Sequence, residues 1–168
     1  MRVYGRQKTG IGADARRNTG FTLVEILVSL VILMMLAVIV ASPLARWRNT
    51  QVLVGEVGAM ISLIEDARSR TLGSLDGKGY GVHFDTDNAV LFAGTSFTPG
   101  APDNELHMLH SSARIDAISL FGGGSDLVFK RLSGETGQYG SVTIVLTGDT
   151  AQTRRIDISK TGAISIAK

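Results

Sequence analysis

Residues 20–41 read GFTLVEILVSLVILMMLAVIVA, a nearly unbroken apolar run whose single charge is Glu25. A helix rises about 1.5 Å per residue, so the segment from Phe21 to Ala41 reaches about 30 Å and matches the hydrocarbon thickness of a bilayer. The run therefore predicts a membrane-spanning helix over residues 21–41. A carboxylate in such a helix costs a few kcal/mol and by default marks a functional site. The alternative is a charge that is tolerated near the helix end, where it reaches the headgroups.

The first twenty residues differ from the rest of the chain in charge. Five basic residues against one acidic residue give them a net charge of +4, so the +2 of the whole chain leaves −2 for residues 21–168. Basic residues that flank a first hydrophobic segment bias that end toward the cytoplasm, and only Arg46 and Arg48 follow the run. We therefore predict a cytoplasmic N-terminus and a C-terminal domain on the other side of the membrane. The overall basicity is then no argument for nucleic-acid binding.

The hexapeptide Gly20-Phe21-Thr22-Leu23-Val24-Glu25, with basic residues before it and the apolar run after it, resembles the processing motif of type IV pilins and type II secretion pseudopilins. A secretory signal instead has a shorter apolar core and a cleavage site that follows the core. The resemblance implies that a prepilin peptidase cleaves after Gly20, that the new N-terminal Phe21 is N-methylated, and that Glu25 acts in subunit assembly. Residues 1–20 are then an unstructured leader that is removed.

A second helical segment is expected over residues 42–72. Pro43 removes a backbone donor and predicts a kink or partial break, after which the helix resumes. Gly73 and the Gly77-Lys78-Gly79 cluster end it. We interpret Asp66, Arg68 and Arg70 as solvated charges on the helix rim. The helix is amphipathic because its apolar residues recur at helical spacing, at Leu53, Val57, Met60, Ile61, Ile64 and Ala67.

Residues 73–168 predict a periplasmic β-rich domain. Alternating apolar residues and turn signals indicate strands over 80–84, 89–93, 106–109, 115–120, 127–129, 142–146, 155–159 and 163–166. In the terminal hairpin, Ile156 and Ile158 share one face, as do Ile164 and Ile166, so each strand has a core side. The expected fold is α+β, a long N-terminal helix, first transmembrane and then amphipathic, whose apolar stripe packs on the antiparallel β-sheet. This element order resembles the pilin superfamily, and the terminal hairpin resembles that of H-type minor pseudopilins and related fimbrial minor pilins.

Other chemistry is poorly supported by the sequence. The absence of cysteine excludes disulfides and thiolate metal sites. His107 and His110 are three apart and would point to opposite faces of a strand, so we interpret them as solvated polar residues rather than metal ligands. Asp85-Thr86-Asp87-Asn88 is explained as a turn, with calcium binding left open. No G-x-S-x-G motif and no assignable acid/base pair occurs, so we expect neither an enzyme nor a cofactor.

The resemblance therefore implies a minor pseudopilin, a structural subunit of the periplasmic pseudopilus of a type II secretion system, processed by prepilin peptidase. Its expected partners are other pseudopilin or pilin subunits, prepilin peptidase, the inner-membrane assembly platform and the membrane itself. The alternative is a minor type IV pilus subunit used in adhesion, motility or DNA uptake. A DNA-binding module would need a basic patch. Arg154 and Arg155 make only a small one, and the residues after Gly162 lack the arginines of DNA-binding fimbrial minor pilins, so nucleic acid is disfavoured as a partner.

Overall fold

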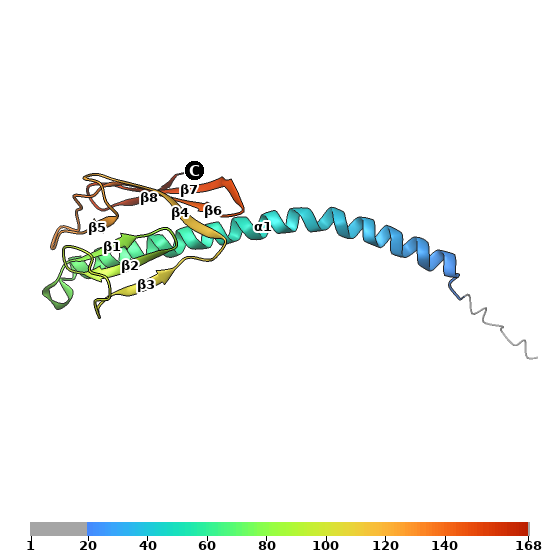
Figure 1. Cartoon of the computed structure of the whole chain (residues 1–168), viewed down its shortest axis with the longest axis horizontal. Coiled ribbons are helices and arrows are strands. Elements are labelled where there is room, and N and C mark those ends of the chain that lie inside the picture. Colours follow the sequence, from blue (N-terminus) through green and yellow to red (C-terminus); the bar gives the residue numbers. More distant parts are fainter. Residues whose placement is uncertain (1–19, 168) are drawn as a thin grey trace, which may run out of the picture. The chain divides into compact units, whose positions relative to one another are not determined.

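The computed structural model describes residues 20–167, apart from the side chains of residues 40–46 and 48. The predicted leader, except for Gly20, lies outside the described residues. Contacts divide the chain after Ala41 into two units, residues 1–41 and 42–168. One helix, α1 (Leu23–Leu72), belongs to both units, and the strands all belong to the second (Figure 1).

The helix α1 is continuous through Pro43. Of the predicted kink or partial break at Pro43, the break is wrong, because the helical assignment runs from Leu23 to Leu72 without interruption, and the kink stays a prediction. A proline inside a helix removes one i to i−4 hydrogen bond, while the turns on either side keep theirs. The predicted helix end is confirmed, since α1 stops at Leu72 and is followed by Gly73 and the short 3-10 helix η1 (Leu75–Gly77).

The C-terminal part of α1 is amphipathic, as the periodicity predicts. Five of the six stripe residues are buried and Ile61 is half-buried against the core. The other residues of the stripe belong to one buried cluster that also contains residues of both sheets: Leu53, Val57, Met60, Ile64 and Ala67. This confirms a helix packed on antiparallel β-structure and an α+β fold.

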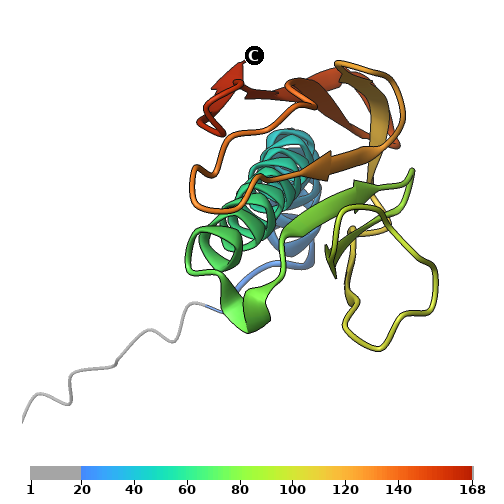
Figure 2. The same cartoon turned by 90° about the vertical axis from the view of Figure 1, so that its left-hand side faces the viewer.

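The strands form two four-stranded antiparallel sheets, where one sheet was predicted. One sheet has the order β3-β2-β1-β5 and the other the order β4-β6-β7-β8, and Figure 2 shows them on neighbouring sides of α1. After β3 the chain leaves the first sheet and begins the second with β4, so β4 pairs with β6 rather than with β3. The strands are β1 (Tyr80–Phe84), β2 (Asn88–Ala93), β3 (Glu105–Met108), β4 (Ala113–Leu120), β5 (Asp126–Val128), β6 (Gly140–Leu146), β7 (Asp149–Ile158) and β8 (Ile164–Ala167).

The terminal hairpin buries only one of its two strands. Ile156 and Ile158 of β7 are buried, as predicted. Ile164 of β8 is half-buried and Ile166 is 58% exposed, so the prediction of a core side for β8 fails at its end. Ile166 pairs with the fully buried Ile156, so the difference in exposure follows from the position of β8 at the edge of the sheet, where no strand covers its outer side.

The charges on the helix rim connect elements instead of being solvated. Arg70 donates to Asp66 Oδ2 at 2.7 Å and to Glu105 Oε2 of β3 at 3.0 Å. These hydrogen bonds raise the pKa of Arg70, and the bond to Glu105 has a larger effect than the bond to Asp66. Arg68 donates from Nε to the Gly134 carbonyl and from Nη2 to the Thr161 carbonyl, each at 3.2 Å. The interpretation of these residues as a solvated rim is therefore wrong for Arg68 and Arg70.

Candidate functional site

The predicted processing residues lie at the start of α1. Gly20 and Phe21 precede the helix and are exposed, and Phe21 keeps 78% of its surface accessible. Thr22 caps the helix, because its Oγ1 accepts a hydrogen bond from the Glu25 N–H at 3.2 Å. The Thr22 carbonyl accepts from the Ile26 N–H, also at 3.2 Å. The bond after Gly20 is therefore two residues from regular helix and accessible to a peptidase.

Glu25 lies in the first turn of α1. This is the favourable end for an anion, since the first backbone N–H groups of a helix have no partner within it and carry partial positive charge. The side chain is exposed, and the Glu25 carbonyl accepts a hydrogen bond from Ser29 Oγ at 2.7 Å. Within the described residues the Glu25 carboxylate makes no ion pair.

The first four turns of α1 expose apolar side chains in every direction. All the large apolar side chains from Phe21 to Ile39 are exposed, and their exposed fractions run from 46% for Leu30 to 78% for Phe21. A soluble monomer rarely shows an apolar patch of more than a few hundred Å². A helix that is apolar all round is covered by protein or by lipid. This surface therefore requires a partner, either other helices or a bilayer.

Among the described residues, no helix combines the length and the hydropathy that crossing a membrane requires. The transmembrane assignment of residues 21–41 stays a prediction.

The structure adds Thr22 to the residues of this site. The sequence pattern could have identified it, because Thr22-x-x-Glu25 is the spacing of a capping box, in which the side chain at the N-cap accepts from the third helical residue. The structure shows the Thr22 half of the box, the hydrogen bond that Thr22 Oγ1 accepts from the Glu25 N–H. A cap at this position fixes where the helix begins, and Gly20 and Phe21 lie before it.

The other candidate residues lie in the second unit, where Asp87 and His110 line one cavity. His107 Nε2 lies 3.7 Å from Glu56 Oε2, and His110 Nδ1 accepts a hydrogen bond from the Ser112 N–H at 3.1 Å. The Asp85–Asn88 segment closes the β1–β2 hairpin, as predicted for a turn. Across residues 20–167 the described side chains contain no group of three or more His, Asp or Glu placed to hold a metal ion.

Residues 15–41 match the prokaryotic N-terminal methylation motif. The match includes Gly20, Phe21 and Glu25 and ends where the first unit ends. It supports the broad pilin superfamily and indicates a type IV pilin-like or pseudopilin substrate of prepilin peptidase, which assembles with other pilin subunits. The motif also suggests membrane anchoring. No curated protein and no solved structure matches the chain.

Proposed function

We propose that this chain is a minor pseudopilin, a structural subunit of the pseudopilus of a type II secretion system, and not an enzyme. Prepilin peptidase removes residues 1–20, and the mature chain begins at Phe21. Residues 21–41 hold it in the inner membrane with the N-terminus in the cytoplasm and residues 42–168 in the periplasm. The observation that carries the proposal is an apolar helix exposed on all sides that starts directly after an accessible processing motif.

The same apolar surface suits both the membrane-bound subunit and the subunit assembled in a filament. In the membrane, lipid covers residues 21–39, and in a filament the helices of neighbouring subunits cover them. Glu25 discriminates between these stages because its carboxylate is costly in lipid. In a helix bundle it is adjacent to the N-terminal amine of a neighbouring Phe21. An ion pair in that low-dielectric setting is strong enough to favour assembly over the membrane-bound state.

The mature N-terminus tests this proposal. The full-length protein is expressed with prepilin peptidase, extracted from membranes and analysed by mass spectrometry, with an expected start at a methylated Phe21. Replacing Gly20 with tryptophan should leave the leader attached, whereas the same replacement at Gly10, within the leader, serves as the matched control and should be cleaved. A mature start at Met1, or one after Ala41, would refute the proposal.

Deletion of the gene tests the assignment to secretion. We expect loss of type II secretion with intact surface pili. Loss of pilus-dependent motility or DNA uptake, with secretion intact, would instead identify the chain as a minor pilus subunit.

A further inference from the structure

The second unit has two ends that the strand registers define. At one end Leu120, Gly140, Ile158 and Ile164 lie side by side across the sheet β4-β6-β7-β8. At the other end Ala113 pairs with Leu146, which pairs with Asp149. The eight residues of β4 separate these ends by about 23 Å at about 3.3 Å per residue. We call them the basic end and the acidic end, for the reasons given next.

The basic end presents an exposed aromatic side chain on a preformed support. Phe121 is 61% exposed, and its ring stacks on Tyr139 with centroids 4.7 Å apart and planes 14° apart. Lys160 Nζ lies 4.7 Å from the centre of the Tyr139 ring. Stacking and the cation–π contact fix the position of Phe121, so little side-chain entropy is lost when a partner covers it. Exposed, ordered aromatic residues of this kind are frequent anchors of protein interfaces.

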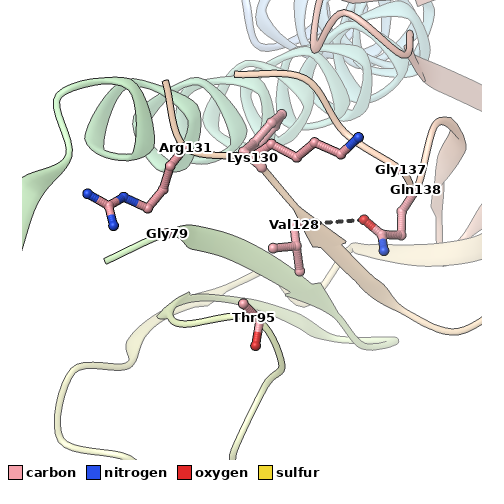
Figure 3. A pocket seen from close by; sticks show the side chains of 8 residues that line it. Gly79, Thr95, Val128, Lys130, Arg131, Gly137 and Gln138 are labelled. Atoms are coloured by element: carbon pink, nitrogen blue, oxygen red, sulfur yellow. Dashed lines mark hydrogen bonds between the residues drawn. The ribbon is translucent and has the colours of Figure 1, made fainter. Parts of the chain in front are cut away.

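A groove of about 520 Å³ is lined by Gln138, the residue before Tyr139, and by residues 128–131. Figure 3 shows Arg131 beside Gly79 and Lys130 extending toward Gly137, so the two cations flank the groove from opposite sides. Within the described residues neither cation makes an ion pair. Glu135 is the one carboxylate in residues 129–139, and the exposed Asp76 of η1 does not line the groove. The groove therefore suits a carboxylate.

The loops of the basic end are held together by Arg68 of α1. Its guanidinium donates to the carbonyls of Gly134 and Thr161. Gly134 lies in the loop after Lys130 and Arg131, and Thr161 lies in the loop that carries Lys160. The Thr136 N–H also donates to the Lys160 carbonyl at 3.0 Å. Figure 2 looks onto this end and shows the loops around the end of α1. The hydrogen bonds thus fix three segments relative to one another: the end of α1, the loop that contains Gly134 and the loop that contains Thr161.

The acidic end collects carboxylates on turns. Asp85 and Asp87 lie in the β1–β2 turn and Asp149 begins β7, and all three are exposed. The segment between β3 and β4 holds these turns together, because the Leu109 N–H donates to the Asp87 carbonyl at 3.0 Å and the Thr147 N–H donates to the Ser112 carbonyl at 2.9 Å.

Arg114 is a described cation at the acidic end; it lines a cavity together with Asp87 and is paired with Asp116 at 2.9 Å. The side chains of Arg46 and Arg48 lie outside the described residues. Within the described part of the chain, Asp85, Asp87 and Asp149 make no ion pair.

We infer that a second copy of this chain docks head to tail on the first, with Asp87 and Asp149 of one copy facing Lys130 and Arg131 of the other. Phe121 is the apolar anchor of the contact. Among the described side chains, the two ends carry opposite charges that make no ion pair, so a surface complementary to the basic end is present on the chain itself. A contact between different surfaces of identical chains leaves one of each surface free and continues into a filament. The inference rests on the proposed role as a filament subunit.

Cross-linking with charge reversal tests the contact in the full chain, purified in detergent. The chain has no cysteine, so Ser133→Cys places a single thiol at the basic end of one copy and Thr147→Cys a single thiol at the acidic end of another. A short bis-maleimide should join the two copies. Reversing the basic end of the first copy (Lys130→Glu with Arg131→Glu) should lower the yield about tenfold.

The charges of the acidic end can also be reversed, and combining the two charge reversals should restore the cross-linking yield. Asp87→Lys with Asp149→Lys in the second copy should also lower the yield about tenfold. Combining the two reversed copies restores the attraction and should return the yield to within about twofold of the wild type. The matched control is Arg154→Glu, an exchange of similar charge in the middle of β7, which should leave the yield unchanged.

Phe121→Ala provides an independent variant, since it alters no charge and should lower the yield about tenfold if the ring is an anchor. Absence of cross-linking in the wild type, or a combined reversal without rescue, would overturn the inference. Mass spectrometry of the same preparation gives the mature N-terminus. Correct processing with charge-independent cross-linking refutes the docking alone, whereas an unprocessed chain refutes the proposed function, and its cross-linking still decides the docking.

Discussion

Gly162 provides a quantitative test of how the basic end is built. It lies in the turn between β7 and β8 with φ of +76°, and its N–H donates to the Ser159 carbonyl at 2.9 Å. A Cβ at this position would lie 2.2 Å from the Gly134 carbonyl oxygen and 2.7 Å from Arg68 Nε. Alanine therefore introduces backbone strain and also forces the two loops and Arg68 apart.

The expected loss in the free energy of unfolding for Gly162→Ala is about 3–4 kcal/mol. Positive φ costs a residue with a Cβ about 1 kcal/mol. Separating the loops removes the Arg68 hydrogen bonds to Gly134 and Thr161, and bonds from a charged donor contribute about 1.5 kcal/mol each at the low end that suits partly exposed groups. Gly100→Ala is the matched control, because Gly100 has φ of +75° with nothing within 4 Å of its Cβ position, and should lose only about 1 kcal/mol.

Thermal unfolding of the full chain in detergent, followed by circular dichroism, measures the difference. At about 4 °C per kcal/mol for a domain of this size, Gly100→Ala should lower Tm by about 4 °C and Gly162→Ala by about 12 °C or more. In an Arg68→Ala background the Gly162 effect should shrink, since one of the two clashing groups and its hydrogen bonds are already gone. Equal Tm shifts for the two glycine variants would refute the reasoning.

Two further predictions concern charges. Glu25→Leu should insert in the membrane at least as well as the wild type, since it removes a cost of at most about 3 kcal/mol, but should fail to cross-link to filament subunits or support secretion; normal assembly would identify Glu25 as a tolerated charge. The hydrogen bond and charge of Asp103 raise the pKa of Lys78 above its usual value of 10.5. A raised folded-state pKa stabilises the fold below the unfolded pKa, so the Tm difference between wild type and Lys78→Met should be present at pH 9 and decline as the pH rises above 10.5. A difference that stays constant with pH would contradict this.

The features that local sequence predicts are those that need only neighbouring residues. The apolar run, the helical stripe from Leu53 to Ala67 and the alternation in β1 and β7 are periodic patterns, and their periods of 3.6 and 2 indicate helix and strand directly. The candidate processing site was found for the same reason, since Gly20, Phe21 and Glu25 lie within six consecutive residues. The capping role of Thr22 could have been predicted from the same six residues, because Thr22 and Glu25 have the spacing of a capping box.

The tertiary structure determines what depends on residues distant in sequence. The pairing of β4 with β6 divides the strands into two sheets, and no local pattern specifies which strand becomes an edge, so the exposure of Ile166 could not be predicted. Arg68 was expected to be solvated because its partners, Gly134 and Thr161, lie 66 and 93 residues away in the chain. The opposite charges of the two ends arise in the same way, from turns that only the fold brings together. Local periodicity selects the elements, and long-range packing selects their neighbours.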